Sequence, residues 1–147
     1  MNGSRVDHTA IVVRDMDEAL GRYRVLLTAE CTERVHVENQ GVEVAFLRLG
    51  DTQIELVQPT CRESGIARFL EERGEGLHHV GIRVTDIRVE LERLRANGIK
   101  LIDEVPRRGV HGLIAFIHPR GTGGTLIELV MHDESDGSPT RVAVETA

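Results

Sequence analysis

Two histidines and two glutamates recur at matching places in the two halves of this 147-residue sequence. His8 belongs to "VDHTAIVV", and His79 occupies the corresponding place in "LHHVGIRV". Glu55 in "TQIELV" and Glu128 in "TLIELV" follow these histidines at nearly equal separations along the chain. Imidazole nitrogens and carboxylate oxygens are ligands that bind divalent cations. The repeat therefore predicts a metal site with two ligands from each half.

Strand alternation predicts where these four side chains point. Successive side chains of a strand face opposite sides of its sheet, so His8 lies on the face opposite Thr9 and Ile11. Each glutamate is likewise flanked by an isoleucine and a leucine. If these bulky residues pack under helices, both His–Glu pairs share the other face, which a curved sheet would turn into a cavity. His78 should point away from His79.

Hydrophobic periodicity and turn residues predict the elements that carry the pairs. The first module, about 5–58, reads as strand 5–13, helix 14–27 and strands 30–38, 42–49 and 52–58; a linker helix lies within about 62–74. The second module, about 77–131, reads as strand 77–84, helix 86–97 and strands 100–104, 111–118 and 124–131. We expect an α+β fold of two β-α-β-β-β modules whose curved mixed sheets surround one metal site. Residues 1–133 should form a single domain and 134–147 a disordered tail.

Composition excludes several classes of function. The net charge is −6 and no long basic cluster is present, which argues against nucleic acid as a partner. Lys100 is the only lysine, so Schiff-base chemistry would have to depend on it alone. Cys31 and Cys61 form no metal or redox motif and read as reduced thiols. The sequence contains neither a membrane-spanning run nor a secretory signal, and we expect a cytoplasmic protein.

The repeated modules resemble the vicinal oxygen chelate (glyoxalase) superfamily, and the motifs are similar to those of methylmalonyl-CoA epimerases. The matching stretches are "VDHTAIVV", "NQGVEVAFL", "IELVQP", "GEGLHHVGIRV", "HGLIAFIHP" and "GGTLIELV", which extend over nearly the whole chain. The resemblance implies interconversion of (2R)- and (2S)-methylmalonyl-CoA by removal and return of the C2 proton. It also implies a small-molecule CoA thioester as the binding partner and a homodimer, which the sequence does not test.

The resemblance also assigns roles to individual residues. His8, Glu55, His79 and Glu128 correspond to the metal ligands, for which Co²⁺ is expected, with Mn²⁺, Zn²⁺, Ni²⁺ or Mg²⁺ as alternatives. Some relatives carry Gln at the position of Glu55, which leaves the metal preference open. Glu43 corresponds to a second acid-base residue, so that Glu43 and Glu128 would act on opposite faces of C2. Glu43 would then share the cavity face with Ala45 and Leu47.

Substrate contacts outside the metal site are less well defined by the sequence. Arg107, Arg108 and Arg120 lie in loops of the second module where a CoA phosphate could bind, although a solvated loop is the simpler interpretation. His111 in "VHGLIAF" could line the substrate pocket or merely end a strand.

Other functions are compatible with the same pattern. A glyoxalase-type isomerase or an epimerase for a different acyl-CoA would use the same metal and bases. An extradiol dioxygenase is disfavoured, because two histidines and one carboxylate suffice for its iron and one glutamate would be surplus. A metal-free small-molecule-binding resistance protein is the alternative from another class; the low aromatic content, 3% with no Trp, argues against a stacking pocket for a planar drug.

Overall fold

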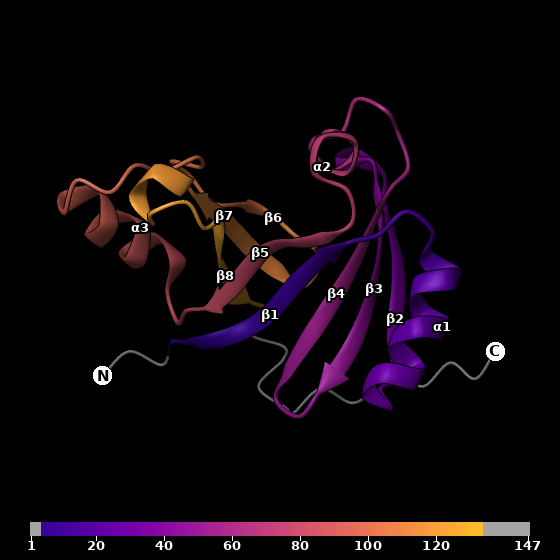
Figure 1. Ribbon diagram of the computed structural model, residues 1–147. Coiled ribbons are helices and arrows are strands. Elements are labelled where there is room, and N and C mark those ends of the chain that lie inside the picture. The colour runs from indigo at the N-terminus through magenta and orange to yellow at the C-terminus, as the bar shows by residue number, and fades with distance from the viewer. Residues whose placement is uncertain (1–3, 134–147) are drawn as a thin grey trace. The chain divides into compact units, whose positions relative to one another are not determined.

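The computed structural model describes residues 4–133, which form two compact units (Figure 1). The first unit is His8–His78, and the second comprises residues 4–7 together with 79–133. The predicted disordered tail, 134–147, lies outside the described residues. No helix in the described part of the chain is both long and apolar enough to cross a membrane.

The first unit is built on strands from the first half of the chain. Its elements are β1 (Arg5–Val12), α1 (Met16–Leu27), β2 (Cys31–Val37), a 3₁₀ turn (Glu38–Gln40), β3 (Val42–Leu49), β4 (Thr52–Pro59) and α2 (Gly65–Arg73). The strand order is β2-β3-β4-β1, with β1 parallel to β4 and the other neighbours antiparallel. β1 enters this unit at His8, because its first residues cluster with the second unit.

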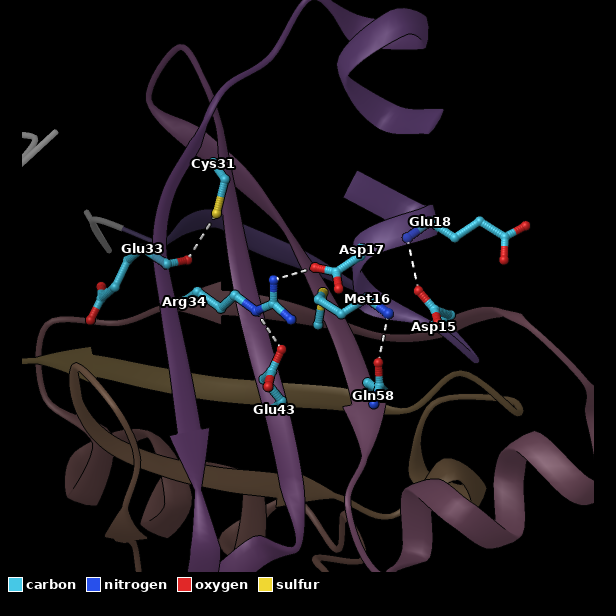
Figure 2. A network of polar contacts seen from close by, with 9 residues as sticks. All are labelled: Asp15, Met16, Asp17, Glu18, Cys31, Glu33, Arg34, Glu43 and Gln58. Carbon is cyan, nitrogen blue, oxygen red and sulfur yellow. Dashed lines mark hydrogen bonds and ion pairs between the residues drawn. The ribbon is translucent and has the colours of Figure 1, made fainter. Parts of the chain in front are cut away.

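Helix α1 begins where the sequence provides a cap and an additional acceptor for its first turn. The Asp15 carboxylate accepts a hydrogen bond from the backbone N–H of Glu18, and the side chain of Gln58 accepts one from that of Met16 (Figure 2). These acceptors satisfy N–H groups that have no partner within the helix. The helix then buries Met16 and Ala19 against β3 and β4, in a core completed by Val13, Ala29, Ala45, Leu47 and Leu56.

The second unit repeats this arrangement with the second half of the chain. It contains α3 (Ile87–Ala96), β6 (Arg107–Arg108), β7 (Gly112–Ile117), a 3₁₀ turn (Pro119–Gly121) and β8 (Ile127–His132). β5 (Gly76–Arg83) enters this unit at His79. The order is β5-β8-β7-β6, with β5 parallel to β8 and the remaining pairs antiparallel. α3 packs on this sheet through a core of Val84, Ile87, Leu91, Leu101, Ala115, Ile117 and Leu129.

The predicted α+β fold of two β-α-β-β-β modules with mixed sheets is confirmed. One predicted strand, 100–104, is wrong: this segment makes only an isolated bridge between Leu101 and Ile117, and the edge strand is β6. The regular ladder stops because the side chain of Asp103, rather than a backbone carbonyl, accepts the N–H of Phe116. Pro106 then precedes the edge strand without a backbone N–H to donate.

Candidate functional site

The first unit brings His8 and Glu55 together on neighbouring strands. Ala10 of β1 lies opposite Glu55 of β4 in the parallel ladder, so His8 and Glu55 occupy the same face. His8 is 2% exposed, and its Nδ1 lies 3.6 Å from Oε1 of Glu55. The opposite face carries Ile11, Ile54 and Leu56 and packs on α1. We call the side that bears the pair the His–Glu face of this sheet.

The second unit places His79 and Glu128 in the same way. Gly81 of β5 lies opposite Glu128 of β8, which sets His79 and Glu128 on one face, the His–Glu face of the second sheet. The Nε2 atom of His79 lies 3.5 Å from Oε2 of Glu128, and both residues are buried. The ring of Phe116 meets the His79 imidazole edge to face, with centroids 5.1 Å apart.

The donor atoms of each pair suit a divalent cation. Ligand bonds of about 2.1 Å place neighbouring donors roughly 3.0 Å apart in octahedral and 3.4 Å apart in tetrahedral geometry. The separations of 3.5 and 3.6 Å are close to these values. Burial removes part of the hydration of Glu128, and to a smaller degree of Glu55, so a nearby positive charge would stabilise these carboxylates. His8, Glu55 and His79 qualify as metal ligands on these grounds.

The orientation predicted for Glu43 is wrong. Glu43 does share a face with Ala45 and Leu47, but that face packs on α1 and is the side away from His8 and Glu55. Its carboxylate accepts a hydrogen bond from Nε of Arg34 at 2.5 Å, and Arg34 also binds Asp17 of α1 (Figure 2). These two carboxylates raise the pKa of the Arg34 guanidinium, chiefly through the hydrogen bond to Asp17.

An apolar residue, Val44, takes the place on the His–Glu face that Glu43 was expected to fill. Val44 lies opposite Val57, and Phe46 lies opposite Glu55. Ile66 of α2 packs against an apolar cluster formed by Ala10, Val42, Val44, Phe46 and Val57. The signal that could have located Glu43 is the pairing register of β3 with β4, which places Glu43 beside Gln58 at the start of α1.

His78 and His79 separate as predicted. His79 belongs to the His–Glu face, whereas His78 has the opposite parity in β5 and contacts the ring of Phe69 in α2, with centroids 5.0 Å apart. Burial, together with the charge of Arg73, lowers the pKa of His78. His78 is therefore suited to packing as a neutral ring.

The two neighbouring arginines of the edge strand also separate. Arg107 lies opposite Ile114, and Arg108 lies opposite Leu113, so they face opposite sides of the second sheet. Arg107 shares the His–Glu face, whereas Arg108 forms a two-atom ion pair with Asp133. The hydrogen bond from Arg108 lowers the pKa of the Asp133 carboxyl.

Three residues that sequence reasoning did not single out lie on or beside the His–Glu face of the second sheet. Phe116 contacts His79, and Asp103 accepts the N–H of Phe116. His132 lies two alternating positions beyond Glu128; its Nε2 is 2.7 Å from Oδ1 of Asp7, and its ring stacks with that of His111. The parity of β8 could have identified His132, but the predicted strand ends at residue 131, one position before it.

Comparison with known proteins reveals similarity over most of this chain. The family model described as "Glyoxalase/Bleomycin resistance protein/Dioxygenase superfamily" matches residues 7–116. The mitochondrial methylmalonyl-CoA epimerase of Homo sapiens is 38% identical over 130 residues, covering 87% of this chain and 74% of the human one. The ethylmalonyl-CoA/methylmalonyl-CoA epimerase of Cereibacter sphaeroides is also 38% identical, over 85% of this chain and 96% of its own.

A solved structure extends the similarity to three dimensions. A methylmalonyl-CoA epimerase in complex with methylmalonyl-CoA and NH4⁺ superposes with a TM-score of 0.85 at 31% identity, covering 89% of this chain and 96% of that one.

Proposed function

Because the chain belongs to the glyoxalase/bleomycin resistance protein/dioxygenase superfamily, we propose that it is a metal-dependent epimerase that interconverts (2R)- and (2S)-methylmalonyl-CoA. The observation that carries the proposal is the pair of His–Glu sets, one from each module, in a chain 38% identical to a methylmalonyl-CoA epimerase. Both histidines and Glu128 are buried, and Glu55 is half-buried. These sets supply both metal ligands and a carboxylate for proton transfer.

We assign the four residues of the two pairs, His8, Glu55, His79 and Glu128, as ligands of one divalent cation. Co²⁺ is the expected ion, with Mn²⁺, Zn²⁺, Ni²⁺ and Mg²⁺ as alternatives. When bound, the cation supplies positive charge that offsets the negative charge developing on the substrate as C2 loses its proton. The two carboxylates and two neutral imidazoles match the preference of such ions for oxygen and nitrogen donors.

Glu128 is the proposed acid-base residue. The proton at C2 of methylmalonyl-CoA lies between a thioester and a carboxylate, both of which withdraw electrons and make that proton removable by a carboxylate base. On its own face Glu128 is bordered by Phe116 and by Val130, which is buried beside Ile114. Inversion requires a proton to reach C2 from the face opposite Glu128, and we propose solvent water as the donor on that face, so that the proton taken by Glu128 is released to solvent.

Glu43 has no part in this proposal, because its carboxylate lies on the α1 side of the first sheet. The His–Glu face of that sheet offers Ala10, Val44 and Phe46 around Glu55 instead. We therefore assign proton transfer to Glu128 and expect no contribution from Glu43.

A panel of substrates tests the reaction class. Metal-loaded protein should epimerise methylmalonyl-CoA. Because the Cereibacter relative is named for both ethylmalonyl-CoA and methylmalonyl-CoA, the rates with these two esters should be compared to measure the acyl preference. Conversion of the hemithioacetal of methylglyoxal and glutathione, without epimerisation of either CoA ester, would replace the proposal with a glyoxalase-type isomerase. Tight binding of small molecules by a protein that binds no metal would favour a resistance protein.

We further propose a homodimer in the cytoplasm. Both follow from the family resemblance and the composition. Sedimentation of the purified protein and fractionation of cells producing it would test them.

A further inference from the structure

Arg107 presents a cation on the His–Glu face of the second sheet. In the antiparallel ladders, Arg107 lies opposite Ile114, and Ile114 lies opposite Val130, which has the parity of Glu128. The neighbouring residue Arg108 has the opposite parity and is engaged by Asp133. Only the first arginine of this strand therefore belongs to the face of Glu128.

The guanidinium of Arg107 is held in place on two sides. Its Nε donates to Oδ1 of Asp103 at 3.3 Å, and its Cζ lies 5.5 Å from the centre of the Phe116 ring, in cation–π contact. Asp103 also accepts the backbone N–H of Phe116 at 2.8 Å, so one carboxylate holds both the arginine and the backbone of the residue whose ring the arginine contacts. The group is thus oriented before any ligand arrives.

The outer edge of this guanidinium remains available. Among residues 4–133, Arg107 donates a side-chain hydrogen bond through Nε to Asp103 and none through Nη1 or Nη2, and its side chain is 46% exposed. Two parallel N–H groups in this position match the two oxygens of a carboxylate or phosphate. Orientation by Asp103 lowers the entropy lost on binding, because the side chain is already ordered.

Phe116 connects this cation with the proposed reaction site. Phe116 lies directly opposite Glu128 in the ladder, and its ring meets the imidazole of His79. Arg107 therefore stands one aromatic ring away from the His79–Glu128 pair. A substrate group bound by Arg107 would therefore be a neighbouring part of the substrate and not the reacting carbon itself.

We propose that Arg107 is an anion-binding, specificity-determining residue that receives an anionic oxygen group of the substrate, a carboxylate or a phosphate, through Nη1 and Nη2. The inference rests on the proposed function for the identity of the substrate. Asp103 and Phe116 are positioning residues for this group. The site would favour acyl thioesters whose anionic group reaches Arg107 while C2 lies beside Glu128.

The test measures equilibrium binding of malonyl-CoA to the metal-loaded protein, because this ligand needs no turnover. Arg107→Gln should raise Kd at least tenfold. Arg107→Lys keeps the charge but loses the bidentate donor, so its Kd should lie between those of the wild type and Arg107→Gln. Arg108→Gln is the matched control and should leave Kd within twofold. Because Arg107 is half exposed, its variants should keep the unfolding midpoint of the wild type.

Ligand truncation identifies the anion. If Arg107 binds the acyl carboxylate, Arg107→Gln should also raise the Kd for malonyl-pantetheine, which lacks the nucleotide phosphates. If Arg107 binds a phosphate, the substitution should leave the Kd for malonyl-pantetheine unchanged and raise the Kd for CoA alone. An unchanged Kd in Arg107→Gln, an equal loss in Arg108→Gln, or no binding of malonyl-CoA by the wild type would overturn the inference. A wild type that binds malonyl-CoA through Arg107 but does not epimerise methylmalonyl-CoA would refute only the proposed function.

Discussion

His78 and His79 are adjacent in the chain but make different contacts, because successive side chains of β5 point to opposite faces of the sheet. His79 pairs with Glu128, whereas His78 packs against Phe69. His79→Ala should lower the affinity for Co²⁺ or Mn²⁺ at least tenfold, since one of the proposed ligands is lost. His78→Ala, the matched control, should keep the metal while losing some stability. Isothermal titration with each ion measures both effects, and equal loss of affinity in the two variants would contradict the assignment of ligands.

Strand alternation also separates Glu43 from the proposed metal ligand Glu55, because the two carboxylates lie on opposite faces of the first sheet. The bond of Glu43 to Arg34 ties β3 to α1 through Asp17 on a partly exposed surface, where ion pairs contribute about 1 kcal/mol or less. Glu43→Gln should therefore lower the free energy of unfolding by that amount and leave epimerisation within about threefold of wild type. Urea denaturation and the rate of epimerisation give the two numbers. A loss of a hundredfold in rate without loss of metal would restore Glu43 as an acid-base residue.

At the scale of elements, the pairing of β7 with β8 sets Phe116 opposite Glu128, and it depends on the absence of a side chain at Gly112. A Cβ built there would lie 2.0 Å from the carbonyl oxygen of Met131, and φ is +159°. Gly112→Ala should cost about 3 kcal/mol or more, because the strands cannot approach without a shift. Gly123, with φ of +76° and no heavy atom within 4 Å of its Cβ position, is the control. Gly123→Ala should cost about 1–2 kcal/mol, from backbone strain alone.

Urea denaturation of the two variants checks this comparison. Equal and small losses of stability would mean that β7 and β8 do not require a close approach at Gly112.

The elements also show how far sequence reasoning reaches. The repeat and the strand period suffice to place His8 with Glu55 and His79 with Glu128, because buried alternation allows one register for each pair. Strand alternation does not predict on which side of the sheet Glu43 lies. It groups Glu43 with Ala45 and Leu47, but only the packing of these two residues on α1 identifies their side of the sheet. The edge strand was misplaced for a related reason, since the capture of the Phe116 N–H by an Asp103 side chain leaves no periodic signal.

At the scale of the whole molecule, metal binding should be visible as stability. A cation that binds only the folded chain stabilises it by about 2.7 kcal/mol at one hundred times its Kd. For a chain of this size, the corresponding rise in Tm is about 5–10 °C. Thermal unfolding with Co²⁺ or Mn²⁺, and again after addition of EDTA, measures the shift. The same rise in His79→Ala would mean that the ion binds elsewhere.

The central claim is that Glu128, in a metal-loaded chain, removes the C2 proton of methylmalonyl-CoA from one face, and that a proton from solvent is added on the other. The most direct measurement is solvent deuterium incorporation at C2, followed by NMR or mass spectrometry, in wild type and Glu128→Gln with metal content determined for each. The account predicts exchange in the wild type and a loss of at least a hundredfold in Glu128→Gln, beyond any change in metal occupancy. A metal-loaded wild type that leaves C2 protonated, or a fully metal-loaded Glu128→Gln that exchanges at the wild-type rate, would contradict it.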